Sequence, residues 1–387
     1  MKGSIFKRKG NSPWTIVYEL DRGPNGKRRR AWTTIRGSFR DAQRKQSELV
    51  QKRQSGTNVE PNRMTVGKLL DRWLATKTDL AAKTHERYAE IVNVHLKPNL
   101  GHYVLEKLRP LDVDDYYARS RATGRRRDGG KLAARTVLQH HRVLREALQQ
   151  AVRWRLLTAN PVDAVTAPRA ARSQVNALDE ADAAQVIHFF AGTRLELPIT
   201  LAITTGMRRG ELLGLRWQDL DADARTLAVR QSLEHTKVTG LAFKSPKAGK
   251  GRRIDLGSIA LDALRRHRIA QVKEKLLLGS AYQDGDLICA APDGKPWHPD
   301  AMTAAYRTLI KDSGFPKTRF HDLRHTHATH LLRQGISPKV VAERLGHATV
   351  AMTLDTYSHV LPVCKPTPRR RLTACCCRRS RRDVRTD

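Results

Sequence analysis

The chain has 387 residues, enough for two or three domains. Its 72 Lys and Arg against 38 Asp and Glu give a formal net charge of +34. This excess favours a protein that binds a polyanion over a soluble protein that is merely basic. The sequence lacks the roughly eighteen consecutive apolar residues of a membrane span, and MKGSIFKRKG is not followed by the apolar stretch of a signal peptide.

The cysteines form no framework for disulfides or metal. They are Cys289, Cys364 and the consecutive run Cys375–Cys377, and none has the CxxC spacing. We therefore expect a protein of the reducing cytoplasm without structural disulfides or zinc.

The first block, residues 1–58, alternates as a small sheet does. The turn signal DRGPNGK, Asp21–Lys27, separates the second and third strand segments, as a hairpin requires. A helix is expected over Phe39–Arg53, with Ser38 as N-cap and Asp41 three residues on. The predicted strands are Ile5–Lys9, Trp14–Leu20 and Arg30–Ile35.

The charge of this region is high. Residues 1–60 hold 15 basic and 5 acidic side chains. A sheet and helix this basic could lie in a DNA groove; the plainer alternative is a charged solubility module.

The second block, residues 63–165, has helical periodicity, with Thr65 as the first N-cap and KPNLG, Lys97–Gly101, as a helix end. Its apolar stripes predict core packing. Basic faces around them and the loop Arg121–Gly130 are available to phosphates. The stripes are Val66, Leu69, Leu70, Trp73 and Leu74; Tyr88, Ile91, Val92 and His95; and Val137, His141, Leu144, Leu148 and Val152.

The segment Ala164–Asn176 consists largely of small and basic residues and contains a proline, a composition that predicts a linker. Residues 175–362 then have a mixed α+β pattern that is mainly helical. Helices are expected near Glu180–Phe190 and Leu195–Thr205, and strands at Thr226–Gln231, Leu241–Lys244 and Arg252–Leu256.

Two stretches of this region suggest phosphate chemistry only weakly by themselves. In TTGMRRGELLGLRWQDLD, Gly206 breaks one helix and Arg208 stands near the start of the next, where backbone N–H groups favour an anion. An arginine there is more often structural than catalytic. The lysine-rich hairpin tip FKSPKAGKGRRIDL, Phe243–Leu256, is a solvated charged turn by default.

The stretch HDLRHTHATH raises the question of a metal site. On a helix His321, Arg324 and His325 share a face, while His327 and His330 point elsewhere. An HExxH zinc site needs a glutamate between its histidines, and Arg324 would repel a dication. A histidine and an arginine one turn apart suit a phosphate better, so we expect no metal here.

Four motifs together resemble the conserved boxes of the tyrosine recombinases, specifically the phage-type integrases: TGMRRGELLGLRW, HDLRHTHAT, LGH and TLDTYSH. Their order and spacing are specific over residues 175–362. The resemblance extends less specifically to residues 63–165, as an all-α core-site-binding domain, and to residues 1–58, as a small α+β arm-site-binding domain. The implied fold is therefore multidomain, with a mixed α+β, mainly α, catalytic domain.

The resemblance also implies the active site. His327 stands where the family usually has an aromatic residue, a packing change, and Lys244 and Lys250 compete with Lys247 for the hairpin position. Glu211 would support the first arginine rather than react. The implied catalytic set is Arg208, Lys247, His321, Arg324, His347 and Tyr357.

In the implied reaction both arginines hold the scissile phosphate while Tyr357 attacks it. A tyrosine pKa near 10 makes the free phenol a poor nucleophile, so His321 is the natural general base, and Lys247 would protonate the departing 5′ oxygen. His347 would hydrogen-bond the phosphate. The 3′-phosphotyrosine conserves the bond's free energy, so no ATP, metal or other cofactor is expected, and the sequence has no GxxxxGK[ST] loop.

The expected protein is a site-specific DNA integrase of a phage or mobile element, acting in the bacterial cytoplasm at the nucleoid. Its implied partners are double-stranded DNA attachment sites and three further copies in a homotetramer, with an excision factor and a host DNA-bending protein as accessories that the sequence does not identify. The rivals are a type IB topoisomerase-like relaxing enzyme and an inactive DNA-binding regulator.

The last segment, residues 363–387, has no helical period and is expected to be a disordered basic tail. Residues 361–387 carry 9 basic and 2 acidic side chains. The tail could bind DNA nonspecifically, be a frameshifted end, or have no specific role.

Overall fold

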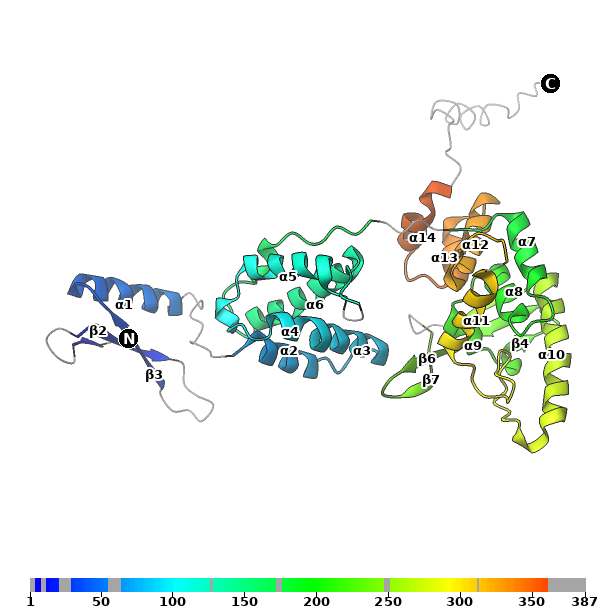
Figure 1. Ribbon diagram of the computed structural model, residues 1–387, viewed down its shortest axis with the longest axis horizontal. Helices are drawn as coiled ribbons and strands as arrows, with labels where there is room; N and C mark the ends of the chain where they lie inside the picture. Colours follow the sequence, from blue (N-terminus) through cyan, green and yellow to red (C-terminus); the bar gives the residue numbers. More distant parts are fainter. Residues whose placement is uncertain are drawn as a thin grey trace, which may run out of the picture. The chain divides into compact units, whose positions relative to one another are not determined.

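The computed structural model describes residues 4–7, 12–20, 29–54, 64–125, 128–171, 176–246, 251–311 and 313–360. The chain divides into two compact units, Met1–Arg172 and Ser173–Asp387. It is mostly helical with small sheets (Figure 1). No helix among the described residues is long and apolar enough to cross a membrane.

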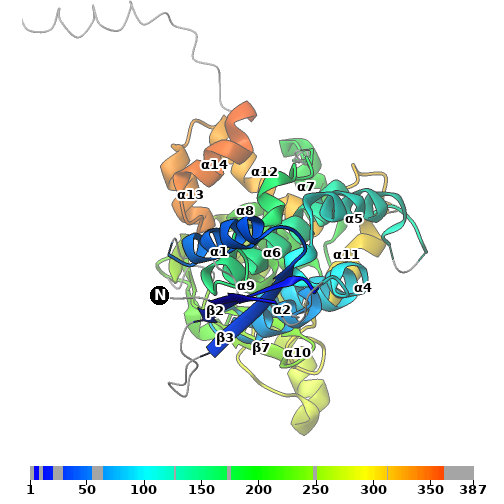
Figure 2. The same cartoon turned by 90° about the vertical axis from the view of Figure 1, so that its left-hand side faces the viewer.

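The chain begins with an antiparallel sheet in the order β1 (Ser4–Phe6), β2 (Trp14–Leu20), β3 (Arg29–Ile35). Helix α1 (Phe39–Gln54) lies across it (Figure 2), and Ile16, Tyr18 and Ala42 are buried. The predicted strands and helix are confirmed, except that β1 ends at Phe6. The predicted turn Asp21–Lys27 lies outside the described residues.

The cap of α1 follows from its sequence as predicted. The Asp41 backbone N–H donates to Ser38 Oγ at 3.2 Å, and the Ser38 N–H donates to Asp41 Oδ2 at 2.9 Å. This reciprocal pair satisfies two donors at the helix start.

The described residues of the next block are helical apart from an isolated β-bridge between Thr65 and Val104, and they have their own core. Thr65 Oγ1 accepts from the Lys68 N–H at 3.3 Å, so the predicted cap is confirmed. The predicted stripes face the core, with Leu74, Tyr88, His95 and Val152 only partly buried. The helices are α2 (Val66–Ala75), α3 (Ala82–Glu90), α4 (Lys97–Leu100), α5 (Pro110–Thr123) and α6 (Ala134–Arg153), with a π-helical turn over Ile91–Leu96 and 3₁₀ turns at Leu105–Lys107 and Pro161–Ala164.

The predicted helix end at Lys97–Gly101 is confirmed. The helix continues through Pro98 to Leu100, and Gly101 is its C-cap. Because the preceding turn is π-helical, the Lys97 N–H donates to the Val92 carbonyl, and the Asn99 side chain donates to the His95 carbonyl at 2.8 Å. These altered partners let a proline sit inside the helix.

The second unit packs helices around a main core and a smaller cluster that includes Leu332, Leu345 and Tyr357, with two small sheets at its side. Strands β4, β5 and β8 form an antiparallel sheet, and β6 pairs with β7 as a separate hairpin. The strands are β4 (Leu220–Asp221), β5 (Thr226–Val229), β6 (Ser232–Thr236), β7 (Gly240–Lys244) and β8 (Arg252–Asp255). β4 was not predicted because its two residues are too few to show alternation. β6 was not predicted because Glu234 and His235 interrupt its apolar pattern.

The helices of this unit bring distant segments together. α8 packs against both α10 and α12. The helices are α7 (Glu180–Phe189), α8 (Glu196–Thr205), α9 (Arg209–Leu213), α10 (Ser258–Leu278), α11 (Pro299–Lys311), α12 (Phe320–Arg333), α13 (Pro338–Leu345) and α14 (Val350–Tyr357), with 3₁₀ turns at Trp217–Asp219, Gly279–Ala281 and Ser358–Val360. Both predicted helices at the start of this unit are confirmed within a residue.

Candidate active site

Arg208 is placed by a glycine break between α8 and α9. Gly206 ends α8 with a φ of 67°, and a Cβ there would lie 2.6 Å from Leu345 Cδ2, so both the left-handed backbone and the space require glycine. Arg208 is the N-cap of α9, as the sequence predicted. Its backbone N–H donates to Glu211 Oε2 at 2.9 Å and its Nη1 donates to Oε1 at 2.8 Å.

Glu211 is the acidic centre of this arrangement. Its carboxylate is 1% exposed and also accepts from Arg252 Nη1 at 3.0 Å and Nη2 at 2.7 Å. Burial would raise its pKa, but the bonds from Arg252 and Arg208 dominate and lower it to about 2. Glu211 is therefore an ionised carboxylate that orients two arginines.

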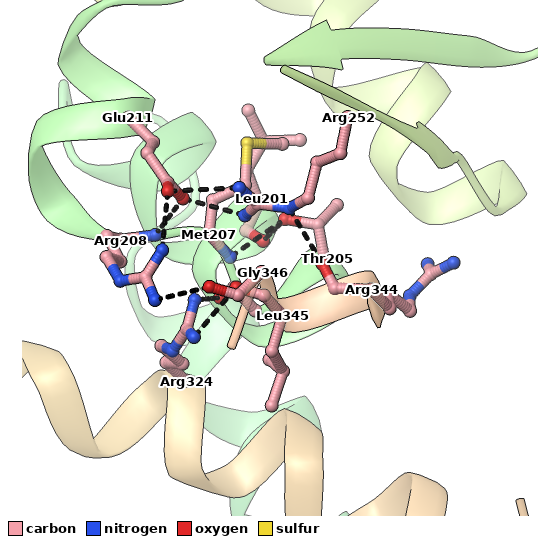
Figure 3. Close-up of polar contacts among 11 residues, drawn as sticks. Leu201, Thr205, Met207, Arg208, Glu211, Arg252, Arg324, Arg344, Leu345 and Gly346 are labelled. Carbon is pink, nitrogen blue, oxygen red and sulfur yellow. Dashed lines mark hydrogen bonds and ion pairs between the residues drawn. The ribbon is translucent and has the colours of Figure 1, made fainter. Parts of the chain in front are cut away.

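Arg324 reaches the same place from α12. Its side chain is buried; Nη1 donates to the Gly206 carbonyl at 2.7 Å and Nη2 to the Leu345 carbonyl at 2.8 Å. Arg208 Nη2 donates to the neighbouring Gly346 carbonyl at 2.8 Å (Figure 3). Two arginines more than a hundred residues apart in sequence are thus held on consecutive carbonyls of one turn.

The cluster has more positive than negative charge. The Glu211 carboxylate pairs with the guanidinium groups of Arg208 and Arg252, and the guanidinium of Arg324 lies nearby at the Leu345 carbonyl (Figure 3). Burial, together with the charges of Arg208 and Arg252, lowers the pKa of Arg324 to about 9. A site with uncompensated, partly desolvated cations favours an anion, and the planar forks suit phosphate oxygens.

Tyr357 ends α14 and is 1% exposed. Its hydroxyl lies 2.5 Å from Nδ1 of His325, a residue that the sequence placed on the right face but to which it gave no role. Burial raises the pKa of Tyr357 to about 12, although the charge of Arg324 opposes the shift. The phenol therefore needs a proton acceptor to become a nucleophile.

The two histidines of the implied catalytic set are His321 and His347. His321 is exposed, and its ring meets the His325 ring edge-on at 5.0 Å between centroids. His347 follows Gly346 and is half-buried, with Nδ1 2.7 Å from Thr353 Oγ1. Partial burial and the charges of Arg324 and Arg208 lower its pKa to about 4. His347 is therefore a neutral hydrogen-bonding group at pH 7.

Three further positions complete the comparison with the sequence. Lys247 and Lys250 lie outside the described residues. His327, expected to be only a packing change, is buried and hydrogen-bonded at both nitrogens, with Nδ1 2.9 Å from the Ile203 carbonyl and Nε2 accepting from Arg344 Nε at 3.2 Å. Burial and Arg344 lower its pKa to about 3, so the ring is neutral and polar contacts replace aromatic packing.

One group of residues in the described part of the chain could approach a metal ion, and it lies outside the arginine cluster. Ligand atoms of His235, His298 and Asp300 lie within 4.8 Å of one another. Asp300 Oδ1 already pairs with Arg209 Nη1 at 3.0 Å, a cation that competes for the same oxygen. The geometry around the arginines involves none of these three residues.

Comparison with known proteins matches two parts of the chain to described families. Residues 173–362 match the Phage integrase family, and residues 65–119 match the family described as Phage integrase, N-terminal SAM-like domain. A protein named Tyrosine recombinase XerC-like, from Caldanaerobacter subterraneus subsp. tengcongensis, is 24% identical over 93% of this chain and 96% of its own length. An integrase from Saccharopolyspora erythraea is 27% identical over 77% of this chain and 79% of its own.

The fold is also found in solved structures. The Tn1549 transposon integrase, solved in complex with transposon right end DNA, matches with a TM-score of 0.68 and 20% identity, over 81% of this chain and 100% of that chain. A lambda integrase tetramer bound to a Holliday junction matches with a TM-score of 0.57 and 21% identity, over 89% and 95%. With its SAM-like and catalytic domains matched in order, the chain belongs to the phage integrase family of tyrosine recombinases.

Proposed function

We propose that this chain is the integrase of a phage or other mobile element, a site-specific recombinase that cleaves and rejoins DNA through a 3′-phosphotyrosine. The observation that carries the proposal is the meeting of Arg208 and Arg324 on the Leu345–Gly346 turn, with Tyr357 bonded to the residue beside Arg324. A phosphate grip and a nucleophile thus converge from four separate motifs.

The proposed chemistry uses side chains alone. Arg208 and Arg324 neutralise charge that develops on the non-bridging oxygens of the pentacoordinate phosphorus, and neutral His347 hydrogen-bonds one of them. Tyr357 attacks phosphorus, a histidine of α12 takes its proton, and Lys247 protonates the 5′ oxygen as it leaves. The tyrosine ester keeps the bond's free energy, so rejoining needs neither ATP nor a metal ion.

The amino-terminal blocks supply DNA contacts in this proposal. On β3, Arg30, Trp32 and Thr34 are exposed, on the face away from the buried Ile16 and Tyr18. A two- or three-stranded ribbon of this kind fits a major groove, which supports residues 1–58 as an arm-site-binding domain. Residues 63–165, matched in part to the SAM-like domain, would hold the core site.

The assembly is proposed from the relatives. The lambda integrase was solved as a tetramer on a Holliday junction and the Tn1549 integrase with circular intermediate DNA. We expect four copies of this chain to hold two attachment sites and exchange strands in pairs. An excision factor and a host DNA-bending protein would then bias the direction.

Supercoiled plasmids that carry the attachment sites of the source element distinguish this proposal from its rivals. Recombinant products support the integrase. Relaxation without recombinants identifies a type IB topoisomerase-like enzyme, and shifted but uncut DNA identifies an inactive regulator.

A further inference from the structure

The hydroxyl of Tyr357 is bonded to a histidine other than the one that the motif resemblance implies. His325 Nδ1 lies 2.5 Å from the phenol oxygen, and the two rings are 5.6 Å apart between centroids. His321, one helical turn earlier, is exposed, and its ring makes a T-shaped contact with the His325 ring at 5.0 Å between centroids. The contact with the nucleophile therefore comes from the second histidine of HDLRH.

His325 has the chemical state that a proton acceptor needs. Burial lowers its pKa, with the charges of Arg324 and Arg319 adding to the shift and that of Asp322 opposing it. The ring is therefore neutral at pH 7, and a neutral imidazole protonated on Nε2 presents Nδ1 as an acceptor to a hydroxyl.

We propose that His325 accepts the hydroxyl proton of Tyr357 as the tyrosine attacks the scissile phosphate, and returns it when the strand is rejoined. The proposal rests on the proposed function. As the O–H bond breaks, its proton passes to Nδ1, the phenol oxygen forms a bond to phosphorus, and the bond from phosphorus to the 5′ oxygen breaks. The 5′ oxygen takes a proton from Lys247, so rejoining runs each transfer backwards without an oxidant or co-reactant.

The position of His325 in the chain supports this role. It directly follows Arg324, whose guanidinium is fixed on the Gly206 and Leu345 carbonyls. The arginine that holds the phosphate and the base that serves the nucleophile are thus adjacent residues of α12. This leaves His321, exposed on the same helix, to contact the phosphate or DNA directly.

The pH response of His325 depends on several neighbours. Tyr357 faces it from α14, and His347 faces it from the turn between α13 and α14. The charged or titratable groups on its own helix and at the start of that helix are Arg319, His321, Asp322 and Arg324.

The first test is His325→Asn, in which an amide replaces Nδ1 and keeps a hydrogen bond but cannot take a proton. Single-turnover cleavage of a nicked suicide substrate should fall about 100-fold, the usual worth of a general base. Binding to the same DNA and the thermal unfolding midpoint should stay near wild type. His330→Gln, on the same helix with Nε2 bonded to the Leu178 carbonyl, is the matched control and should cleave normally.

The second test replaces Tyr357 by 3,5-difluorotyrosine, whose phenol is more acidic and needs less help from a base. It should restore most of the cleavage lost in His325→Asn, and the rate of His325→Asn with natural tyrosine should rise steadily with pH. A purely structural role for His325 predicts neither the rescue nor the altered pH profile. The fluorinated chain with His325 intact shows that the replacement itself permits cleavage.

The outcomes are distinguishable. If wild type forms no covalent complex, the proposed function fails. If wild type cleaves and the rate of His325→Asn is within about threefold of the wild-type rate, His325 is not the acceptor. Such a loss is far smaller than the usual contribution of a general base to the rate. Rescue by difluorotyrosine of His321→Asn but not of His325→Asn would overturn the proposal in favour of His321.

Discussion

The carboxylate of Glu211 accepts hydrogen bonds from both terminal nitrogens of Arg252, at 3.0 and 2.7 Å, while it also holds Arg208. Arg252 Nε donates in turn to the Arg344 carbonyl at 2.9 Å. Strand β8 is thereby tied to α9 and to the end of α13, so Arg252 orients the site through Glu211.

Replacing Glu211 by Gln should destabilise the catalytic unit, because the guanidinium groups of Arg208 and Arg252 would lose their shared carboxylate. Since folding lowers the Glu211 pKa from 4.5 to about 2, its stabilisation is complete above the unfolded value and is lost as pH falls through the folded one. Unfolding free energies should differ by about 3 kcal/mol at neutral pH and converge in acid. A gap that does not change with pH would contradict this account.

Arg324→Lys should keep the charge but lose the fork that reaches the Gly206 and Leu345 carbonyls. We expect cleavage to fall about 100-fold or more, as when one transition-state donor is removed. The exposed Arg333, on the same helix, gives the control Arg333→Lys, which should cleave as wild type does. Equal rates for the two variants, measured in single turnover, would remove Arg324 from the phosphate grip.

Lys247→Ala should be rescued by a substrate with a sulfur at the 5′ bridging position, because a thiolate leaves without a proton. The comparison is Lys250→Ala, which should cleave the oxygen substrate at nearly the wild-type rate. If Lys250→Ala needs the sulfur and Lys247→Ala does not, the leaving-group acid is Lys250.

Deleting residues 1–58 should remove the β1–β3 sheet with α1 and leave the arginine cluster whole. Covalent cleavage of isolated core sites should persist, while recombination between full attachment sites should be lost. Both reactions are measured on gels. Undiminished full-site recombination by the deleted chain would show that residues 1–58 do not bind arm sites.

Much of the fold follows from local patterns in the sequence. The caps at Ser38 and Thr65 and the stripe of α6 are local signals, and the structure has them where they were expected. The continuation of α4 through Pro98 depends on a π-helical turn that no local periodicity reveals. The residues of β6 have a mixed polar and apolar pattern, and they form a strand because they pair with β7.

The motifs predicted which residues belong to the site but not the contacts between them. No spacing rule indicates that Arg252 is bidentate to Glu211, or that the Leu345 and Gly346 carbonyls receive two arginines. The sequence placed His321 and His325 on one helical face, and only the tertiary structure shows that the Tyr357 hydroxyl is bonded to His325. These contacts join segments that are distant in sequence, which is why the motifs did not reveal them.

Covalent trapping at Tyr357 tests the central claim most directly. A nicked suicide duplex, built from the attachment site at the ends of the source element, is incubated with the wild-type chain and with Tyr357→Phe, and products are separated on a denaturing gel. The account predicts a protein–DNA adduct through a 3′-phosphotyrosine for wild type, and none for Tyr357→Phe despite unchanged DNA binding and thermal stability. An equal yield of adduct from Tyr357→Phe would contradict it.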